Sequence, residues 1–584
     1  MNKTMYMKKS MIKGFASVIF ASALLNSCNL LDLTPKAAVT VKTYFKNESE
    51  LDLYANRFYS DILPGGSGIY KEIGDNMIWI PLASEVSLTR TVPETGGGWS
   101  FEALRHINFL LENIGNCGDQ AAVRKYTGVA KFFRAHYYFN MVKRFGDVPW
   151  IDHVPGTDDP VLYKPRDSRD VVMEHVIGDL DEAIELFRKE NSTKDLYHVT
   201  WWTALALKSR ICLFEGTFRK YHGLADSEKW LRLCVESSNE LMTASRGYSL
   251  YSSGSQPYRD LFTSDNAKSV EVILARDYDQ ASSLANSVLN TFNTPGEGRC
   301  GFTKKFVNSY LMADGTRFTD RPGYDRLEFA DEVTGRDPRL AQTIRTTKGL
   351  NFANCITGYQ PHKYITEANL GSSESSYNDL PLFRMAEVYL NYAEAKAELG
   401  EITQNDLDVS VNKIRERAKM PAMSLSDANG APDPYLSSPE TGYTNVTGAN
   451  KGVILEIRRE RTIELVLESQ NRWWDLIRWK AGACIGQKIE GIYIPSDKIG
   501  KAYDVNVDGT ADICVYGGTQ PSVKENVTWF NIDTDYRLSE GDSGKIVFFS
   551  DVERKWNEER DYFYPIPKED ITLTGGKIEQ NKGW

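Results

Sequence analysis

Residues 379–399 read DLPLFRMAEVYLNYAEAKAEL, and this stretch decides the fold class. Bulky apolar side chains recur every three or four positions, which is the spacing of one face of an α-helix. Alanines stand between them, and a large residue beside a small one lets two helices pack closely, as in tetratricopeptide-type arrays. The bulky positions are Leu382, Met385, Tyr389, Tyr392 and Leu399, and the small ones are Ala386, Ala393, Ala395 and Ala397. The stretch predicts a mainly α fold of stacked helix pairs.

The same periodicity occurs nearer the N-terminus. Residues 121–145 show one amphipathic face, and Gly146 directly after them is typical of a helix end. A second helix is expected to begin with Asp167 or Ser168 as its N-cap, because a side-chain oxygen there can accept a backbone N–H of the first turn. A third is expected over residues 200–215. These helices predict a first scaffold region before the one that contains residues 379–399.

The two helical regions divide the chain. We expect a tetratricopeptide-like scaffold in two parts, residues 28–245 and 379–481. Residues 246–378 are rich in Gly, Ser, Asn, Asp and Pro, which predicts a loop-rich, partly irregular lobe. Loops carried on a rigid scaffold are where ligands usually bind, so this lobe is the expected ligand-binding lobe. Residues 482–584 form a C-terminal lobe.

The first 27 residues are typical of an export signal. A lysine-rich start precedes the apolar run of residues 14–25, which is too short to span a bilayer. The run ends in Leu25-Asn26-Ser27-Cys28, a pattern of bacterial lipoprotein signals. It predicts that Cys28 is the lipid-bearing first residue of the mature chain, anchored to a membrane without spanning it. An ordinary signal peptide that happens to contain a cysteine is the alternative.

Composition excludes several other classes of protein. The net charge of -10 argues against a nucleic-acid partner, which would need a basic face. The remaining cysteines have no CxxC spacing and no even pairing, so we expect buried thiols, not a zinc site or a disulfide framework. They are Cys117, Cys212, Cys234, Cys300, Cys355, Cys484 and Cys514. Aromatic residues make up 11% of the chain, which suits both a helical core and stacking on sugars.

Several motifs in a fixed order resemble one known family. They are WSF (99–101), INFLL (107–111), RAHYYF (134–139), FGDVP (145–149), the stretch 379–395, EIRRER (456–461), RWWDLIRW (472–479) and YPIP (564–567). Together with the lipoprotein signal, they make the chain similar to the SusD/RagB family of outer-membrane nutrient-binding lipoproteins. Most of the motifs are structural: Trp473, Trp474 and Trp479 lie at helical spacing beside apolar residues and are expected in the core.

The resemblance implies a function. SusD-like proteins are mainly helical, lie at the cell surface by a lipid anchor in the outer membrane, and deliver ligand to a TonB-dependent transporter of the SusC type. The implied ligand is an oligosaccharide or polysaccharide, bound without catalysis. A peptide ligand, as in RagB-like members, is the alternative. A glycoside hydrolase has less support, because no recognisable catalytic motif stands out, and a purely structural scaffold would not need the aromatic loops.

Ligand residues in this family come from variable loops, so we select them by residue type. A sugar site combines aromatic faces with polar groups that reach hydroxyls. The loop at residues 70–99 supplies Tyr70, Asp75, Trp79, Arg90 and Trp99, of which Trp79 is the strongest candidate and Trp99 is more typical of core. The middle lobe supplies Arg276, Asp277, Tyr278, Asn293, Arg299 and Tyr359.

One segment of the C-terminal lobe resembles a calcium loop. Asp504, Asn506, Asp508 and Asp512 place oxygen side chains at positions one, three, five and nine, with glycine at position six. Position twelve is Val515, where the usual glutamate is missing, and no helix pattern precedes the loop. The segment predicts either a structural calcium ion or an Asx-rich hairpin turn.

Overall fold

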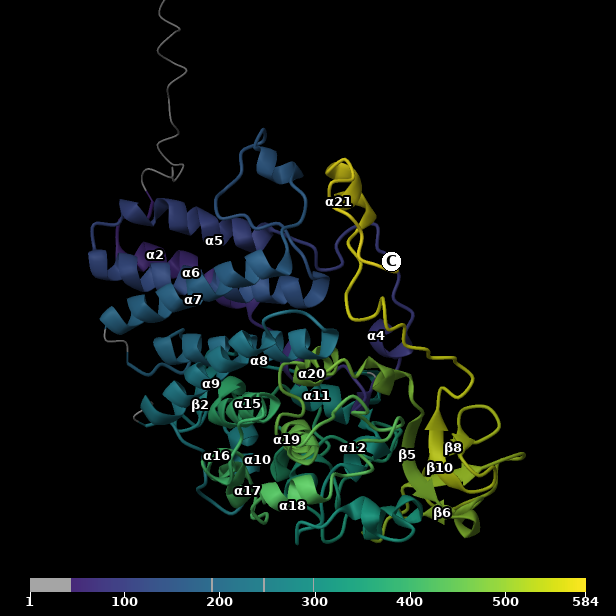
Figure 1. Cartoon of the computed structure of the whole chain (residues 1–584). Coiled ribbons are helices and arrows are strands. Elements are labelled where there is room, and N and C mark those ends of the chain that lie inside the picture. Colours follow the sequence, from purple (N-terminus) through teal and green to yellow (C-terminus); the bar gives the residue numbers. More distant parts are fainter. Residues whose placement is uncertain (1–43, 191–192, 245–246, 298) are drawn as a thin grey trace, which may run out of the picture.

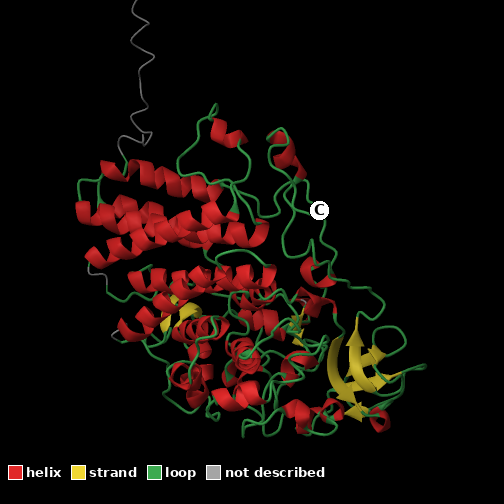
Figure 2. Ribbon diagram, in the orientation of Figure 1, coloured by secondary structure: helices red, strands yellow, loops and turns green. Residues whose placement is uncertain are grey.

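A computed structural model describes residues 44–190, 193–244, 247–297 and 299–584. The predicted signal peptide and Cys28 lie outside these residues. Helices make up most of the ordered structure, and the strands are short (Figure 2). The mainly α prediction is therefore confirmed.

The helices and strands have the following bounds. The α-helices are α2 (Glu48–Ile62), α3 (Gly66–Tyr70), α4 (Ser84–Ser87), α5 (Glu102–Asn113), α6 (Gln120–Phe145), α7 (Arg169–Lys189), α8 (Trp201–His222), α9 (Ser227–Ala244), α10 (Pro257–Thr263), α11 (Val288–Asn293), α12 (Lys304–Asn308), α13 (Phe329–Glu332), α14 (Arg339–Thr343), α15 (Met385–Glu398), α16 (Gln404–Asp408), α17 (Val411–Arg417), α18 (Leu425–Gly430), α19 (Lys451–Glu464), α20 (Asn471–Arg478) and α21 (Lys568–Leu573). The strands are β1 (Met77–Ile78), β2 (Val272–Arg276), β3 (Gly301–Phe302), β4 (Leu380–Arg384), β5 (Ile489–Ile494), β6 (Ala502–Tyr503), β7 (Ile513–Tyr516), β8 (Thr528–Asn531), β9 (Arg537–Leu538) and β10 (Gly544–Phe548).

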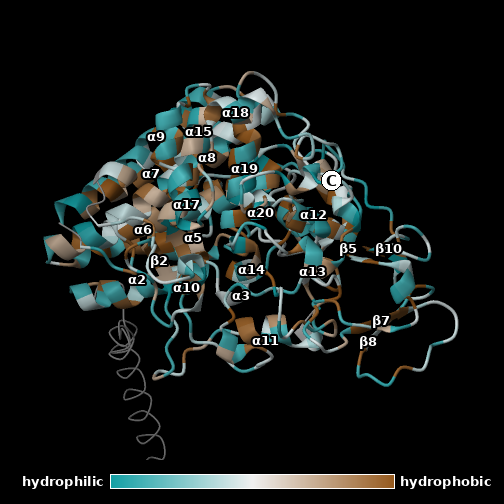
Figure 3. Cartoon of the chain, turned by 90° about the horizontal axis from the view of Figure 1, so that it is seen from below, coloured by the Kyte–Doolittle hydropathy of each residue, from teal (hydrophilic) through white to brown (hydrophobic). Residues whose placement is uncertain are grey.

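The long helices stack in sequence order, and later helices join the same stack. Helices α2, α5, α6 and α7 form one layer, and α8 packs against α7 below it (Figure 1). Helix α15 then packs against α8, α9 and α19, so the C-terminal scaffold region continues the N-terminal one. Many helices carry both apolar and polar residues, as Figure 3 shows from below. The arrangement is the tetratricopeptide-like scaffold expected from large and small residues on one helix face.

Local sequence signals set the helix ends. The Ser168 hydroxyl accepts the backbone N–H of Val171 and caps α7, as predicted. Helix α6 ends at Gly146, whose N–H donates to the carbonyl of Val142 and whose φ of 76° lies where glycine is favoured. Helix α8 begins one residue after the expected start and runs on to His222, beyond the predicted residues 200–215.

The strands of the C-terminal lobe form two three-stranded sheets. One has the order β5-β10-β9 and is antiparallel. The other has the order β6-β7-β8, with β7 and β8 parallel. Residues 532–536 connect β8 in one sheet to β9 in the other, so this short segment lies where the two sheets meet. Both sheets stand at one side of the helical scaffold (Figure 1).

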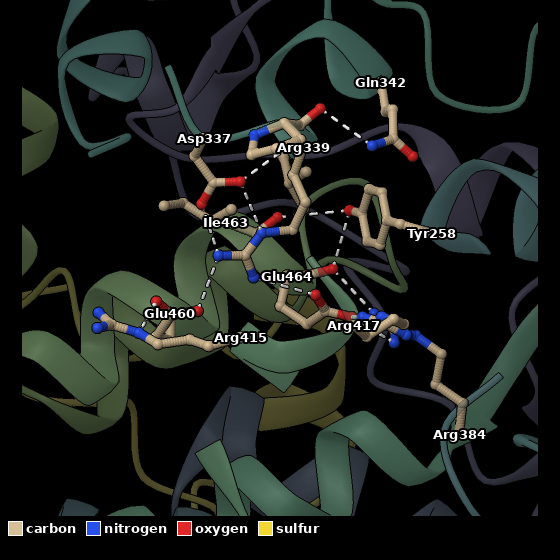
Figure 4. Close-up of polar contacts among 12 residues, drawn as sticks. Tyr258, Asp337, Arg339, Gln342, Arg384, Arg415, Arg417, Glu460, Ile463 and Glu464 are labelled. Carbon is tan, nitrogen blue, oxygen red and sulfur yellow. Dashed lines mark hydrogen bonds and ion pairs between the residues drawn. The ribbon is translucent and has the colours of Figure 1, made fainter. Parts of the chain in front are cut away.

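A buried network of ion pairs joins elements that are far apart in sequence (Figure 4). Arg339 of α14 pairs with Glu460 at 2.9 Å and with Glu464 at 3.2 Å, both on α19. Arg384 of β4 lies 2.7 Å from Glu464, and Arg417 of α17 contacts the same carboxylate. Burial alone would raise the pKa of Glu464, but the three guanidinium groups lower it below its ordinary value. Each buried charge is therefore compensated by several partners.

The expected core residues are mostly confirmed. Trp473 and Trp479 are buried, whereas Trp474 is partly exposed. The seven cysteines from Cys117 to Cys514 are all free and buried, so none of them forms a disulfide. In the part of the chain that the structure describes, no helix combines the length and apolar character needed to cross a bilayer.

Candidate functional site

A hollow of about 530 Å³ opens beside the two sheets of the C-terminal lobe. Four of its lining residues are aromatic, among them Trp529 of β8 and Tyr536 of the segment that joins the two sheets. Arg299 comes from the middle lobe, and Ile80 comes from the loop that follows β1. The remaining lining residues are Thr534, Asp535, Arg537, Val547, Phe548, Phe549, Ser550, Asp551 and Val552. We call this site the Trp529 hollow.

Neighbouring rings fix the side chains of Trp529 and Tyr536. The Tyr536 ring lies 4.8 Å from Phe530 with an interplanar angle of 30°, and the Phe548 ring meets it edge-on at 5.4 Å. The Trp529 ring packs edge-on against Tyr516 at 5.7 Å. Trp529 and Tyr536 nevertheless remain partly exposed. Rings that are already held in place and partly exposed lose little side-chain entropy when a ligand contacts them.

Polar groups surround these rings. Burial raises the pKa of Tyr536, and the adjacent Arg299 guanidinium opposes that rise. The Arg299 Nε–H has no hydrogen-bond partner among the described residues. Arg537 is held by its own turn, because its Nη1 donates to the carbonyls of Ile532 and Tyr536 at 2.9 and 3.0 Å. The hollow can therefore bind a ligand that combines a flat apolar face with several hydroxyl groups.

Two predicted regions meet at the Trp529 hollow. Arg299 lines it, and Ile80 brings the 70–99 loop to its edge. Trp79 is partly buried: its Nε1 donates to the carbonyl of Glu72 at 2.9 Å, and its ring lies 6.3 Å from that of Phe292. Tyr278 is also partly exposed, but it is not among the residues that line the hollow.

Three other predicted ligand residues lie in the core. Tyr70 and Tyr359 are fully buried; the Tyr70 hydroxyl lies 2.9 Å from Ser287 Oγ, and the Tyr359 hydroxyl donates to Glu332 at 2.8 Å. Trp99 is 5% exposed and packs edge-on against Phe145 at 4.9 Å. These predictions are corrected, because side chains buried to this extent leave almost no surface for a ligand.

The two predicted charged residues of the 70–99 loop are also structural. Asp75 forms ion pairs with Arg472 at 2.6 Å and Lys305 at 2.5 Å, and its side chain is 3% exposed. Arg90 is buried, and its Nη2 donates to the carbonyl of Asp561 at 2.6 Å. Both predictions are corrected: a charged group paired inside the protein is not available to a ligand.

Two other candidates of the middle lobe, Arg276 and Asn293, also have internal hydrogen-bond partners. Arg276 Nη2 donates to the carbonyls of Tyr59 and Leu63, and Asn293 Nδ2 donates to that of Ser372. Among the predicted ligand residues of the middle lobe, only Asp277 is well exposed. Trp529 and Tyr536 belong to residues 482–584, for which the sequence predicts a calcium loop or turn and no ligand residues. The available signal was an aromatic strand followed by a polar turn, TWFNIDTDY at residues 528–536.

In the predicted calcium loop, carboxylate oxygens accept hydrogen bonds from the loop's own backbone N–H groups. Asp504 accepts the N–H groups of Asp508 and Gly509 at 3.1 and 2.8 Å, and Asp512 accepts that of Val505 at 2.8 Å. The described residues contain no group of three or more His, Cys, Asp or Glu side chains placed to hold a metal ion. These hydrogen bonds match the Asx-rich turn, the second of the two predictions for this segment.

Comparison with known proteins identifies the family. The sequence profile of the SusD family matches residues 261–584, which is more than half of the chain. The chain belongs to the SusD family. A second profile, described as starch-binding and associating with the outer membrane, matches residues 98–213. Two relatives from Formosa agariphila, SusD-like proteins P38 and P2, are each 26% identical over 63% and 65% of this chain and 69% and 71% of their own length.

Solved structures show the same fold. A SusD-like protein of Bacteroides fragilis aligns with a TM-score of 0.67 over 93% of this chain and 98% of its own, at 21% identity. A SusD-like carbohydrate-binding protein of the same species aligns at 0.66 over 91% and 99%, at 19% identity. A laminarin-binding SusD-like protein aligns at 0.54 over 92% and 100%, at 18% identity. The SusD-like scaffold is thus shared along nearly the whole chain.

Proposed function

We propose that this protein binds an oligosaccharide or polysaccharide in the Trp529 hollow without cleaving it. The observation that carries the proposal is the pair of held, partly exposed rings, Trp529 and Tyr536, beside the charged side chains of Arg299 and Arg537. A pyranose ring presents C–H groups to an aromatic face and hydroxyls around its edge, which is the complement of this arrangement. Membership of the SusD family supports the same ligand class.

The proposal includes a place of action and a partner. The protein is anchored to the outer membrane through Cys28, faces the outside of the cell, and passes the glycan to a SusC-like TonB-dependent transporter. Support comes from the lipoprotein pattern Leu25-Asn26-Ser27-Cys28 and from the family profile described as associating with the outer membrane. Fractionation of cells expressing Cys28→Ala tests the anchor, since loss of the lipid should release the protein from the membrane fraction.

Calorimetry with starch-type and laminarin-type oligosaccharides tests ligand binding. Trp529→Ala should lower affinity at least about tenfold, which corresponds to about 1.4 kcal/mol of lost stacking. Trp201→Ala is the matched control, because Trp201 is also partly exposed but lies at the start of α8 and does not line the hollow. Trp79→Ala should have a smaller effect on affinity than Trp529→Ala, since Trp79 is held by Glu72 and reaches the hollow only through Ile80.

The same samples separate the alternatives. Chromatography after incubation should recover the oligosaccharides unshortened, and shortened products would identify a glycoside hydrolase. Tight binding of a peptide with no binding of any sugar would assign the protein to the RagB-like class. Equal affinity of wild type and Trp529→Ala would remove the hollow as the binding site.

A further inference from the structure

A second cavity lies inside the scaffold, away from the C-terminal sheets. It has a volume of about 220 Å³ and is bounded by α6, α8, β4, α20 and the segment between α19 and α20. Its polar lining includes His136, Asn140 and Lys143 of α6 and Gln470 and Asn471 at the start of α20. We call it the Lys143 cavity. Several of its lining residues are partly exposed, so the cavity communicates with solvent.

The cations of the cavity wall differ in their partners. Arg210 pairs with Glu387 at 2.6 Å, Arg461 with Asp475 at 2.8 Å, and Arg478 with Glu394 at 2.5 Å. Lys143 makes no ion pair and donates no hydrogen bond within the described part of the chain. Its ammonium group lies over two rings instead, 4.5 Å from the centre of Phe139 and 4.6 Å from that of Trp474. Of these four side chains, Lys143 is therefore the one without an ion-pair partner in the described part of the chain.

Other polar groups of the cavity wall also have no hydrogen-bond partner among the described residues. His136 is 6% exposed, and its Nδ1 has no hydrogen-bond partner among the described residues. The side-chain amides of Asn140, Gln470 and Asn471 make no hydrogen bond to any described residue of the chain. Buried polar groups are usually hydrogen-bonded, so the unpartnered His136 Nδ1, with three free amides beside it, indicates a place for a bound polar molecule.

The segment that forms one edge of the cavity is strained. Leu467, Ser469 and Gln470 have φ values of 61°, 55° and 58°, a left-handed conformation that side chains other than glycine rarely adopt. Two hydrogen bonds hold the segment: the Leu467 N–H donates to Glu72 at 2.7 Å, and the Ser469 N–H donates to the carbonyl of Ile69 at 2.8 Å. Strained backbone fixed in this way is concentrated at ligand sites.

We propose that the Lys143 cavity binds a small hydroxylated organic anion, of the class of a monosaccharide acid, with the carboxylate on Lys143 Nζ. The free amides of Asn140, Gln470 and Asn471 face its hydroxyls, and the rings of Phe139 and Trp474 hold the Lys143 ammonium in place. A carboxylate supplies the missing counter-ion for Lys143. Burial and the neighbouring Arg210 lower the pKa of Lys143 to about 7, so a bound anion would also restore its positive charge.

Calorimetry on the full chain at low salt, with D-glucuronate, D-galacturonate and neutral D-glucose, tests this site. At least one of the two acids should bind, and glucose should bind at least about tenfold more weakly. Lys143→Met keeps the apolar stem over Phe139 and Trp474 but removes the charge, so it should weaken binding of the acid at least about tenfold, whereas Lys143→Arg should retain it. Lys125→Met is the matched control, since Lys125 lies on the same helix and is exposed.

Three results with the sugars would overturn the proposal. They are binding of neither acid, equal binding of glucose and the acids, and an affinity that Lys143→Met leaves unchanged. Sulfate is the inorganic control: a Lys143-dependent site with equal affinity for sulfate and the acids would be a general anion site, contrary to the class proposed. Trp529→Ala should leave binding of the acid unchanged, so failure here is distinguishable from failure of the glycan proposal.

Discussion

The Asp75 carboxylate and the Arg472 guanidinium form a two-point ion pair. Asp75 Oδ1 lies 2.6 Å from Nε of Arg472, and Oδ2 lies 2.8 Å from its Nη2. Lys305 adds a third contact at 2.5 Å. The pair joins the segment before β1 to helix α20 near the other end of the chain. The loop that carries Ile80 to the Trp529 hollow is therefore anchored to the scaffold.

Replacing Asp75 with Asn should destabilise the fold severely. The change leaves Arg472 and Lys305 buried without a counter-charge, and breaking a buried pair in this way costs roughly 3–5 kcal/mol. Arg472 and Lys305 lower the pKa of Asp75 against the effect of burial, so its stabilisation is present above its unfolded pKa of about 3.9 and is lost only in stronger acid. The difference in free energy of unfolding between wild type and Asp75→Asn, measured by urea unfolding, should be the same at pH 5 and pH 7.

The control is Asp61→Asn. Asp61 pairs with Arg57 on the surface of α2, where loss of an i,i+4 pair costs about 0.5 kcal/mol or less. An Asp75→Asn protein as stable as this control would show that the Asp75–Arg472 pair does not hold the loop.

Trp473 and Trp474 should respond differently to truncation, although they are neighbours. Trp473 is 1% exposed, and Trp473→Ala should cost roughly 3–5 kcal/mol because a large core cavity remains. Trp474 is partly exposed on the Lys143 cavity, so Trp474→Ala should cost less. Denaturant unfolding of both variants measures the two losses. A larger loss of unfolding free energy in Trp474→Ala than in Trp473→Ala would contradict the burial of these two side chains.

Asp512→Asn should stabilise the protein above pH 6. Burial, together with Asp508 and Asp504, raises the pKa of Asp512 to about 6. The pKa of Asp512 is higher in the folded protein than in the unfolded chain. The free energy of unfolding therefore falls as the pH rises from about 4 to about 6. The amide removes that ionisation and can still accept the N–H of Val505. The melting temperature of the variant minus that of wild type should therefore grow between pH 4 and pH 6 and then level off.

Chelation tests the calcium prediction. The Asp504 and Asp512 oxygens already accept backbone N–H groups, so we expect EDTA to leave the melting temperature unchanged. A bound ion would stabilise the folded state by mass action, and chelator would then lower the melting temperature. If that fall occurred in wild type and disappeared in Asp508→Ala, the loop would be a calcium site after all.

The sequence predicts helix caps and helix ends well, but it predicts poorly which side chains are exposed to solvent. The Ser168 cap and the Gly146 helix end depend on neighbours within a few positions, and both are confirmed. Whether Tyr70 or Trp529 reaches the surface depends on residues hundreds of positions away: the Tyr70 hydroxyl meets Ser287 inside the protein. Periodicity identifies a helix face, but it does not show which loops close over a given side chain.

The charge network and the Trp529 hollow share no residue. Arg339, Arg384 and Arg417 meet on α19, whereas the hollow is lined largely by the segments around β8, β9 and β10. A protein engineer could therefore transplant residues 532–537 and 549–552 from a relative with another sugar preference and leave every one of those ion pairs in place. Under the proposed function, ligand specificity could therefore be changed without altering the buried ion pairs.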